Sequence, residues 1–256
     1  MLAVERRNKI EQLINENKSV LVVELAKLFD VTTETIRGDL EKLERQGVLV
    51  RTYGGATLLD NSEIELAITE RDTVNYEGKQ RIGKYAADII KDGETIFLDA
   101  STSAWHLARY LKAKRGITVI TNAEKVVNEL SSCDHIHVVC VGGVLTPKNM
   151  SYVGRVAEHT IKENYYANKC FFSCRGVTLG RGLVDSSEGE AEIKKAMLSC
   201  SESSIFLCDK NKIGKIGVPR IASLDDIDVF ITDAKLTDEW EKELASKDVK
   251  LVTVEK

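Results

Sequence analysis

The sequence predicts two domains of different class, an α+β winged helix-turn-helix and an α/β domain with a mainly parallel, Rossmann-like sheet. Residues 20–56 contain two stretches of helical apolar spacing separated by a short break, and a hairpin with glycines follows them. From residue 95 onward, short apolar runs alternate with helical patterns. A chain of 256 residues suits one small and one ordinary domain, so we expect domains at 1–59 and 77–256 with a polar linker over 60–76.

Three helices are predicted in the N-terminal domain from the spacing of its apolar residues. Thr32 is expected to begin the third helix, because its hydroxyl can accept a hydrogen bond from an amide of the first turn. Gly47 is expected to end that helix in a left-handed conformation. The apolar stripes that face a common core are Ile10, Leu13 and Ile14, then Val22, Leu25, Ala26 and Phe29, then Ile36, Leu40 and Leu43.

A two-stranded wing is predicted after the third helix. Residues 48–52 form an apolar run, residues 53–55 form a turn, and residues 56–59 can pair back. Helices and a wing in this order are built to place the third helix in a DNA major groove. The residues expected to contact DNA are Thr32, Thr33, Glu34, Thr35, Arg37, Gly38, Lys42, Arg51 and Tyr53.

The charge of the N-terminal domain leaves an alternative open. Residues 1–56 carry nine Lys or Arg and nine Asp or Glu, so the domain is formally neutral. Phosphate contacts need local positive charge, which the fold would have to gather. A helical hairpin that binds protein is therefore the alternative to DNA binding. The basic residues available are Arg6, Arg7, Lys9, Arg37, Lys42, Arg45 and Arg51.

The second domain is predicted from seven apolar runs separated by helices. Continuous apolar strands that alternate with helices are typical of a parallel sheet covered on both faces. Ahead of the first strand we expect a short helix around residues 64–71 and a longer one over 79–90. The predicted strands are 95–99, 117–122, 137–141, 169–173, 204–209, 229–233 and 250–254.

Small, hydroxyl-bearing or charged residues follow several of these strands. Ligands of parallel sheets bind beyond the carboxyl ends of the strands. Hydroxyls and free amides at a helix N-terminus attract anions, although the same residues can be simple helix caps. Donors and cations together suit a phosphorylated, hydroxyl-rich small molecule. The segments concerned are 99–103, 121–122, 142–143, 175–176, 185–190 and 209–212.

Specific motifs in the N-terminal domain resemble those of the DeoR family of bacterial transcriptional regulators. They are Arg6-Arg7-x-x-Ile10, the VELAKLF helix, Thr35-Ile36-Arg37-Gly38-Asp39-Leu40 and Arg51-Thr52-Tyr53-Gly54-Gly55-Ala56. The resemblance continues through nearly the whole chain. Two positions depart from the family pattern: Gly38 stands where Arg or Lys is usual, and Leu21 replaces the usual Ser or Thr cap.

The resemblance implies that the second domain is like ribose-5-phosphate isomerase and coenzyme A transferases and senses a sugar phosphate. Ser101-Thr102-Ser103 replaces the family's Gly-Thr-Thr, and Cys174-Arg175 replaces small residues, which adds a cation. The implied effector contacts are Asp99, Ser101, Thr102, Ser103, Thr121, Asn122, Gly142, Gly143, Arg175, Gly176, Asp185, Glu190, Lys194 and Lys212.

The expected function is that of a DNA-binding repressor of a carbohydrate-metabolism operon, which a phosphorylated sugar releases from operator DNA. A homodimer or homotetramer is expected, because major-groove readers usually meet two half-sites. The alternative is a sugar-phosphate isomerase with a DNA-binding arm, in which Glu190 or Asp185 acts as base and Lys194 or Lys212 stabilises an enediolate. We expect the regulator, with no catalytic residues and no cofactor.

Composition limits the remaining classes of protein. No stretch approaches the roughly 18 apolar residues of a membrane span, and the N-terminus lacks a signal-peptide pattern, so a cytoplasmic protein is expected. The histidines show no metal-ligand spacing, and no metal site is expected. Cys140 and Cys208 are expected in buried strands as reduced thiols, and a redox role of Cys170 and Cys174 is the alternative.

Overall fold

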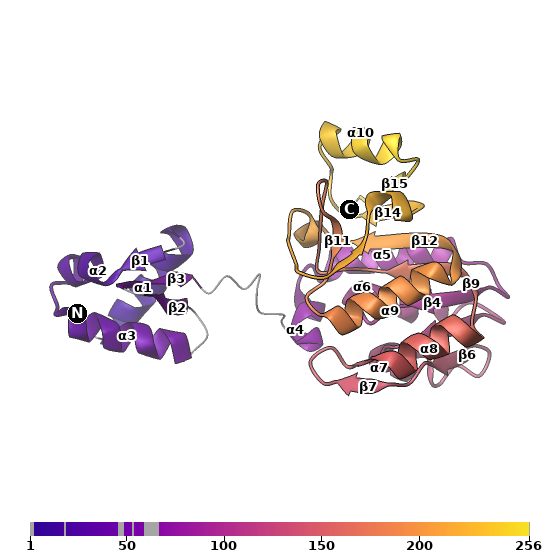
Figure 1. Ribbon diagram of the computed structural model, residues 1–256, viewed down its shortest axis with the longest axis horizontal. Coiled ribbons are helices and arrows are strands. Elements are labelled where there is room, and N and C mark those ends of the chain that lie inside the picture. The colour runs from indigo at the N-terminus through magenta and orange to yellow at the C-terminus, as the bar shows by residue number, and fades with distance from the viewer. Residues whose placement is uncertain (1–2, 18, 46–48, 53, 59–66, 256) are drawn as a thin grey trace. The chain divides into compact units, whose positions relative to one another are not determined.

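The computed structural model describes residues 3–17, 19–45, 49–52, 54–58 and 67–255. Two compact units make up the chain, Met1–Glu65 and Leu66–Lys256, as Figure 1 shows. Within the described ranges, no helix combines the length and the apolar character that crossing a membrane would require.

The N-terminal unit has the predicted helices and wing, with one further strand. Its three-stranded antiparallel sheet has the order β1-β3-β2, so the strand between the first two helices extends the wing. The elements are α1 (Ala3–Asn17), β1 (Ser19–Leu21), α2 (Val22–Phe29), α3 (Thr33–Arg45), β2 (Leu49–Thr52) and β3 (Gly55–Leu58). The predicted helix end at Gly47 lies outside the described residues.

Local hydrogen bonds explain where the helices of this unit begin. The hydroxyl of Thr32 accepts from the amide of Thr35 at 3.2 Å, which confirms the predicted cap. Leu21, at the N-cap of α2, offers no side-chain acceptor. The wing supplies one instead, because the amide of Val22 donates to the carbonyl of Gly54 at 3.0 Å. The departure at Leu21 is therefore compensated by backbone from the hairpin.

The core of the N-terminal unit is small and is reinforced by an ion pair. The predicted stripe residues Ile10, Ile36 and Leu40 are buried. Arg6 is also buried, and its Nε donates to Asp39 Oδ2 at 2.6 Å. Arg6 therefore joins α1 to α3 and is not available as the phosphate contact that its charge suggested.

The C-terminal unit contains a seven-stranded sheet in which every pairing is parallel. This confirms the predicted α/β class, and each predicted apolar run is one strand of the sheet. In spatial order the strands are β15 (Lys250–Thr253), β14 (Val229–Thr232), β12 (Ser201–Cys208), β9 (Ala167–Phe172), β4 (Thr95–Leu98), β5 (Thr118–Thr121) and β6 (His137–Cys140).

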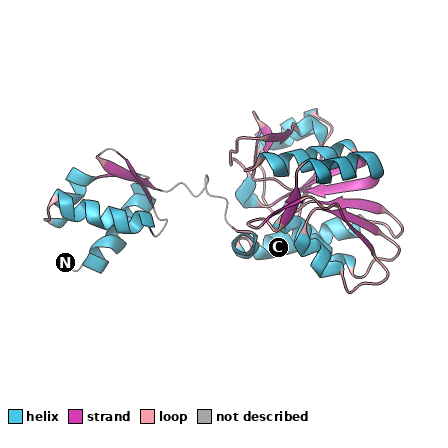
Figure 2. Ribbon diagram, turned by 60° about the horizontal axis from the view of Figure 1, so that its bottom comes forward, coloured by secondary structure: helices cyan, strands magenta, loops and turns pink. Residues whose placement is uncertain are grey.

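Helices cover both faces of this sheet, as Figure 2 shows. Alternate residues of one strand enter different cores: Phe206 packs with the α8, α9 and α10 side, whereas Ile205 and Leu207 pack with the α5, α6 and α7 side. The helices are α5 (Tyr76–Asp88), α6 (Thr102–Leu111), α7 (Glu124–Leu130), α8 (Arg155–Asn164), α9 (Glu188–Ser199) and α10 (Asp238–Ser246).

The segment predicted as a linker is partly a docked element. A short helix, α4 (Ile68–Thr73), lies slightly later than expected, and Ile68 is buried. Its amide donates to the carbonyl of Lys148 at 3.0 Å. Residues 67–76 therefore belong to the C-terminal unit. Burial of the apolar side chain of Ile68 favours this docking. Residues 59–66 lie outside the described part of the chain.

Two small antiparallel additions were not predicted. A hairpin of β7 (Val144–Thr146) and β8 (Ser151–Val153) follows β6, and a second sheet consists of β10 (Gly176–Thr178), β11 (Gly182–Val184) and β13 (Arg220–Ala222). The prediction that Cys140 is buried was wrong, since β6 is the edge strand and Cys140 is exposed. Cys208, in β12, is buried as expected.

Candidate functional site

A buried polar cluster lies where β4 and β9 end. Asp99 directly follows β4, and its side chain is fully buried. Its Oδ1 accepts from the amide and hydroxyl of Ser101 at 3.2 and 2.6 Å, and its Oδ2 accepts from the amide of Ser173 at 3.0 Å. Asp99 thus links the ends of the neighbouring strands β4 and β9. This structural role is additional to the ligand contact that the sequence predicts.

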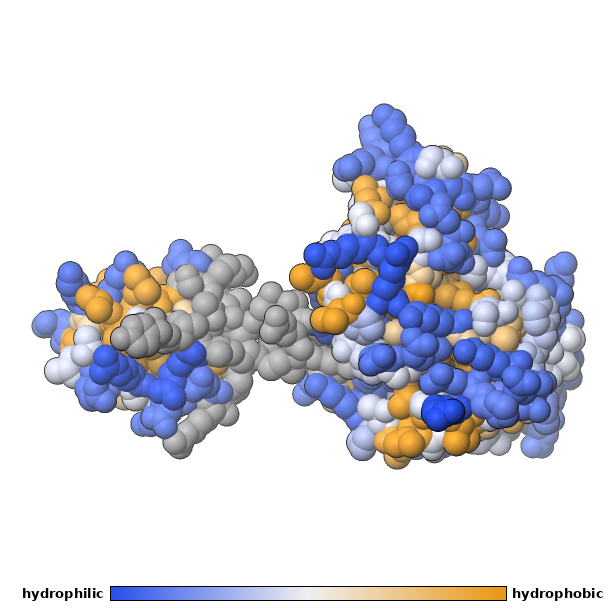
Figure 3. Space-filling view, in the orientation of Figure 1, coloured by the Kyte–Doolittle hydropathy of each residue, from blue (hydrophilic) through white to orange (hydrophobic). Residues whose placement is uncertain are grey.

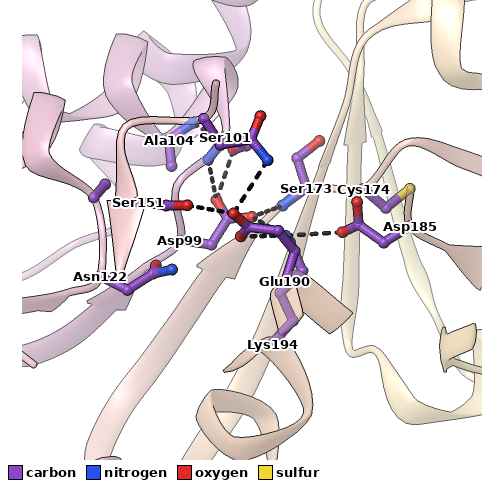
Figure 4. Close-up of polar contacts among 12 residues, drawn as sticks. Asp99, Ser101, Ala104, Asn122, Ser151, Ser173, Cys174, Asp185, Glu190 and Lys194 are labelled. Atoms are coloured by element: carbon purple, nitrogen blue, oxygen red, sulfur yellow. Dashed lines mark hydrogen bonds and ion pairs between the residues drawn. The ribbon is translucent and has the colours of Figure 1, made fainter. Parts of the chain in front are cut away.

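Lys194 of α9 reaches this cluster and meets three carboxylates (Figure 4). Its Nζ lies 2.9 Å from Asp185 Oδ2, 3.6 Å from Asp99 Oδ2 and 3.6 Å from Glu190 Oε2. All four side chains are buried, with Lys194 only 4% exposed. The structure therefore brings Asp99 of the first half of the domain together with three predicted residues from the segment 185–194.

The pKa values of the cluster follow from these contacts. Burial alone would lower the pKa of Lys194, but the carboxylates of Asp185, Asp99 and Glu190 outweigh it and raise that pKa above its ordinary value. Burial would raise the pKa of Asp185, but Lys194 and the amide of Ser186 outweigh it and lower that pKa. Lys194 and Asp185 are therefore charged at neutral pH.

Two contacts of Glu190 were missing from the sequence prediction. Oε1 of Glu190 accepts from the hydroxyl of Ser151 and from Nδ2 of Asn149, the latter at 3.2 Å. Both donors come from the β7–β8 hairpin and are buried. Strands of three residues give too little alternation to be predicted, so no pattern in the sequence indicated these donors.

The N-terminus of α6 carries the predicted hydroxyls. The hydroxyl of Ser101 caps the helix by accepting from the amide of Ala104 at 3.1 Å. Thr102 and Ser103 follow in the first turn, and both are buried. Within the described part of the chain, the hydroxyl of Ser103 and Oδ1 of Asn122 have no hydrogen-bond partner. Buried polar atoms are normally satisfied, so these two indicate a place for a bound polar molecule.

Other predicted contacts have structural roles in the sheet. The hydroxyl of Thr121 donates to the carbonyl of Leu98 at 2.7 Å and accepts from the amide of Ala123 at 3.0 Å. A Cβ on Gly143 would lie 2.7 Å from the carbonyl oxygen of Val153, so this glycine allows the β8 backbone to approach. Packing therefore accounts for both residues without a ligand.

Three of the remaining predicted residues, Arg175, Gly176 and Lys212, lie close to Cys174 in the chain or contact it, and the fourth is Gly142. The Nζ of Lys212 donates to the carbonyl of Cys174, and the amide of Arg175 donates to the carbonyl of Val184 at 3.1 Å. Gly176 packs against the backbone of Lys215, whose carbonyl oxygen would lie 2.2 Å from an added Cβ. Gly142 has a positive φ of 70° and open space around it. Burial raises the pKa of the Cys174 thiol to about 12, which makes it a poor redox thiol.

A second buried group of charged residues was not predicted. Nε2 of His106 lies 2.9 Å from Asp72 Oδ1, and burial, aided by the charge of Arg109, lowers the pKa of His106 to about 4. The Nζ of Lys79 donates to the carbonyl of Arg71, and burial lowers the pKa of Lys79 to about 8. These residues lie on α4, α5 and α6, where the sequence indicated only a linker and helices.

Most of the predicted DNA-contact residues are exposed on α3, just before it, or in the wing. Arg37 pairs with Glu34 at 2.9 Å, and a Cβ on Gly38 would meet no atom within 4 Å. In the wing, Nε of Arg51 lies 2.7 Å from Glu44 Oε2. Tyr53 lies outside the described residues. Among the others, Thr32, Thr33, Glu34, Arg37, Lys42 and Arg51 are exposed, and Thr35 and Gly38 are half-buried.

Among the residues that the structure describes, no group of three or more His, Cys, Asp or Glu side chains is placed to hold a metal ion. The acidic cluster around Lys194 is neutralised in part by that ammonium and therefore differs from a cation cage.

Comparison with known proteins places both units. The DeoR-like helix-turn-helix domain matches residues 6–62, and the DeoR C terminal sensor domain matches residues 74–234. Among solved structures, the chain is similar to ribose 5-phosphate isomerase A from Methanocaldococcus jannaschii, with a TM-score of 0.41 and 17% identity over 55% of this chain and 56% of that chain.

Curated relatives match along nearly their whole length. An uncharacterized HTH-type transcriptional regulator, YulB of Bacillus subtilis (strain 168), is 41% identical over 99% of this chain and 98% of its own. A putative aga operon transcriptional repressor of Escherichia coli O157:H7 is 31% identical over 90% and 86%. The L-fucose operon activator of Haemophilus influenzae (strain ATCC 51907 / DSM 11121 / KW20 / Rd) is 31% identical over 96% and 98%.

These matches decide between the regulator and the isomerase with a DNA-binding arm. The relatives are named as transcriptional regulators, and both domain matches are those of a DNA-binding and sensing protein, so the chain is not an enzyme. The chain belongs to the DeoR family of DNA-binding transcriptional regulators.

Proposed function

We propose that this protein is a repressor of a carbohydrate-metabolism operon and that a phosphorylated sugar lowers its affinity for operator DNA. The observation that carries the proposal is the polar cluster at the strand ends. There Ser103, in the first turn of α6, and Asn122, directly after β5, each have a buried polar atom without a hydrogen-bond partner among the described residues. Ligands of parallel sheets bind at this edge.

The charges of the cluster suggest how a sugar phosphate would be oriented. Lys194 contributes one positive charge, and Asp99, Asp185 and Glu190 contribute three negative ones, so the group is formally −2. A phosphate would be repelled there, whereas sugar hydroxyls are donors that carboxylates accept. We therefore assign the hydroxyls to the carboxylate side.

The phosphate would then bind to hydrogen-bond donors at the N-terminus of α6. Amides of the first turn of α6 that precede Ala104 and the hydroxyl of Ser103 can donate to phosphate oxygens. Lys212 lies half-buried beyond the end of β12 and supplies a cation. The effector contacts predicted from the sequence are thereby divided into a hydroxyl side and a phosphate side.

The N-terminal unit would bind operator DNA through α3 and the wing. Helix α3 exposes Arg37 and Lys42, and the wing exposes Arg51. One relative is named a repressor and another an activator, so the sign of regulation rests on the experiment below. A bacterial DNA partner also implies a cytoplasmic location.

A homodimer or homotetramer would supply the second recognition helix. The C-terminal unit exposes the apolar side chains of Val144 and Val156, which are 71% and 65% exposed. Figure 3 shows hydrophobic surface over the β7 region. Exposed apolar patches of this kind mark association surfaces, and pairing of copies there would bring two half-site readers together.

Selection of genomic DNA by the full-length protein tests the function. The purified protein is mixed with genomic fragments, with and without separate pools of pentose and hexose phosphates, and the bound fragments are sequenced. We expect a few enriched sites near carbohydrate genes and loss of enrichment with one pool. Enrichment that increases with a pool would contradict release by the sugar phosphate, and enrichment that no pool changes would contradict the sensing part.

A further inference from the structure

Helix α4 is connected to the candidate site through a chain of polar contacts. Nη2 of Arg71 donates to Oδ1 of Asn149 at 2.8 Å. Nδ2 of Asn149 donates to Oε1 of Glu190 at 3.2 Å, and Oε2 of Glu190 lies 3.6 Å from Nζ of Lys194. Three contacts therefore lead from the first helix of the C-terminal unit to the buried ammonium.

Helix α4 is the part of the C-terminal unit that comes first in the chain. The C-terminal unit begins at Leu66, so α4 is its first helix after the N-terminal unit. The amide of Ile68 also donates to the carbonyl of Lys148, the residue before Asn149. Backbone and side chain of α4 thus bind the same turn of the β7–β8 hairpin, which carries the donors to Glu190.

The chemistry of the amide makes Asn149 a directional connection. Asn149 is 2% exposed and has one acceptor oxygen and one donor nitrogen. Because Arg71 can only donate, it fixes the oxygen toward itself and the nitrogen toward Glu190. The reversed amide would place its oxygen against the Glu190 carboxylate, and two acceptors would then repel each other.

We propose that Arg71 is a positioning residue of the effector site, which acts through Asn149 to orient Glu190 and by the same contacts makes α4 respond to that site. The effector part of this inference rests on the proposed function, whereas the link from Glu190 to α4 does not. A molecule that draws the Glu190 carboxylate toward itself weakens the contact to Asn149. Arg71 then loses its fixed acceptor, and α4 loosens.

A second anchor of α4 provides a comparison. Oδ1 of Asp72 lies 2.9 Å from Nε2 of His106, and Oδ2 of Asp72 lies 3.7 Å from Nη2 of Arg109. Both partners are on α6. This anchor holds the same helix without passing through Asn149 or Glu190. Loss of it would loosen α4 for a purely structural reason.

Amide hydrogen exchange of the full-length protein, without sugar phosphate or DNA, tests the link. Glu190→Met removes the carboxylate but leaves Lys194 paired with Asp185 and Asp99, so the domain should still fold. We expect exchange in Ile68–Thr73 to rise about tenfold, as loss of one charge-assisted hydrogen bond implies. Glu190→Gln keeps an acceptor and should restore most of the protection.

Glu192→Met is the matched control, because Glu192 lies on the same helix and pairs with Lys195 at the surface. It should leave exchange in α4 unchanged. Equal exchange of α4 in Glu190→Met and wild type would overturn the link, and so would a rise no larger than that in α10. Either result leaves the proposed function standing, since no effector enters the experiment.

Effector binding tests the positioning role. Ribose 5-phosphate, glucose 6-phosphate and fructose 1-phosphate are titrated separately, with the thermal midpoint of the C-terminal unit as readout. For a sugar phosphate that stabilises wild type, Arg71→Met should weaken its binding about tenfold and Arg71→Lys should recover part of it, whereas Asp72→Asn should not weaken it. Equal binding by Arg71→Met and wild type would overturn the positioning role, and no binding by wild type would contradict the proposed function.

Discussion

Nζ of Lys194 lies 2.9 Å from Oδ2 of Asp185, and both side chains are almost completely buried. With Asp99 and Glu190 each 3.6 Å away, a single ammonium is shared by three carboxylates. Breaking a buried ion pair by removing one partner leaves uncompensated charge in a medium of low dielectric constant. The cluster is therefore a stability element as well as a candidate binding site.

Replacing Lys194 should destabilise the C-terminal unit strongly. Lys194→Met leaves three buried carboxylates without their cation, and we expect a loss of about 3–5 kcal/mol in the free energy of unfolding. Urea denaturation followed by far-ultraviolet circular dichroism measures it. The control is Lys195→Met, whose partner Glu192 is at the surface, and it should cost at most about 1 kcal/mol. Similar losses in both variants would contradict the prediction.

The His106–Asp72 pair should make stability depend on pH. Burial lowers the pKa of His106 from the ordinary 6.5 to about 4 in the folded protein. Between these values the unfolded chain binds a proton that the folded chain does not, so stability falls as the pH is lowered through this range. Urea midpoints measured from about pH 7 down to about pH 4.5 should decrease.

Two histidine variants attribute this slope to one residue. His106→Gln should flatten the change of the midpoint with pH, because the titrating group is gone. His135→Gln is the control, since His135 is exposed and its Nε2 lies 3.0 Å from the carbonyl oxygen of Lys112. An unchanged slope in His106→Gln would assign the pH dependence to other groups.

The strands of the parallel sheet could be predicted from the sequence, whereas the contacts within the candidate site could be predicted only in part. All seven parallel strands were predictable, because each is a short apolar run between helical patterns, and the interior strands such as β12 are buried on both faces. Asp99, Asp185 and Lys194 were predicted individually, but their common contact depends on strand order, which has no local signal. Asn149 was missed because it lies in a turn between two three-residue strands.

The docking of α4 on the C-terminal unit also could not be predicted from local sequence. Residues 60–76 are polar and weakly periodic, so the sequence indicates a linker. In α4 the buried residue is Ile68, and Arg71 and Asp72 are held by partners 78 and 34 residues away along the chain. Charged residues satisfied by distant partners cannot be told from solvated ones in a single sequence.

Arg37 should determine the DNA sequence preference of the protein. Its side chain is exposed on α3, where Glu34 holds it at 2.9 Å. If Arg37 donates to a guanine, Arg37→Ala should weaken operator binding by about 1–3 kcal/mol and relax preference at one base pair. Fluorescence anisotropy with single-base operator variants measures it. Arg51→Ala should instead weaken all sequences alike, and an equally uniform loss for Arg37→Ala would make it a phosphate contact.

Gly38 should separate contact with DNA from the stability of α3. A Cβ there meets no atom within 4 Å, so a side chain is tolerated by the N-terminal unit. Gly38→Ala should stabilise the helix by about 1 kcal/mol. Gly38→Arg adds a cation on the side of α3 that we expect to face DNA, and one more phosphate contact should steepen the dependence of log affinity on log salt by about 0.9.

The two Gly38 variants together decide why a glycine stands there. If Gly38 lets the helix backbone approach DNA closely, Gly38→Ala weakens operator binding even though the helix is more stable, and Gly38→Arg weakens it further. If the position is open toward DNA, Gly38→Ala leaves affinity unchanged and Gly38→Arg raises affinity for all sequences at low salt. Because the protein itself offers space for a Cβ, a loss of affinity in Gly38→Ala can be assigned to the DNA side of the contact.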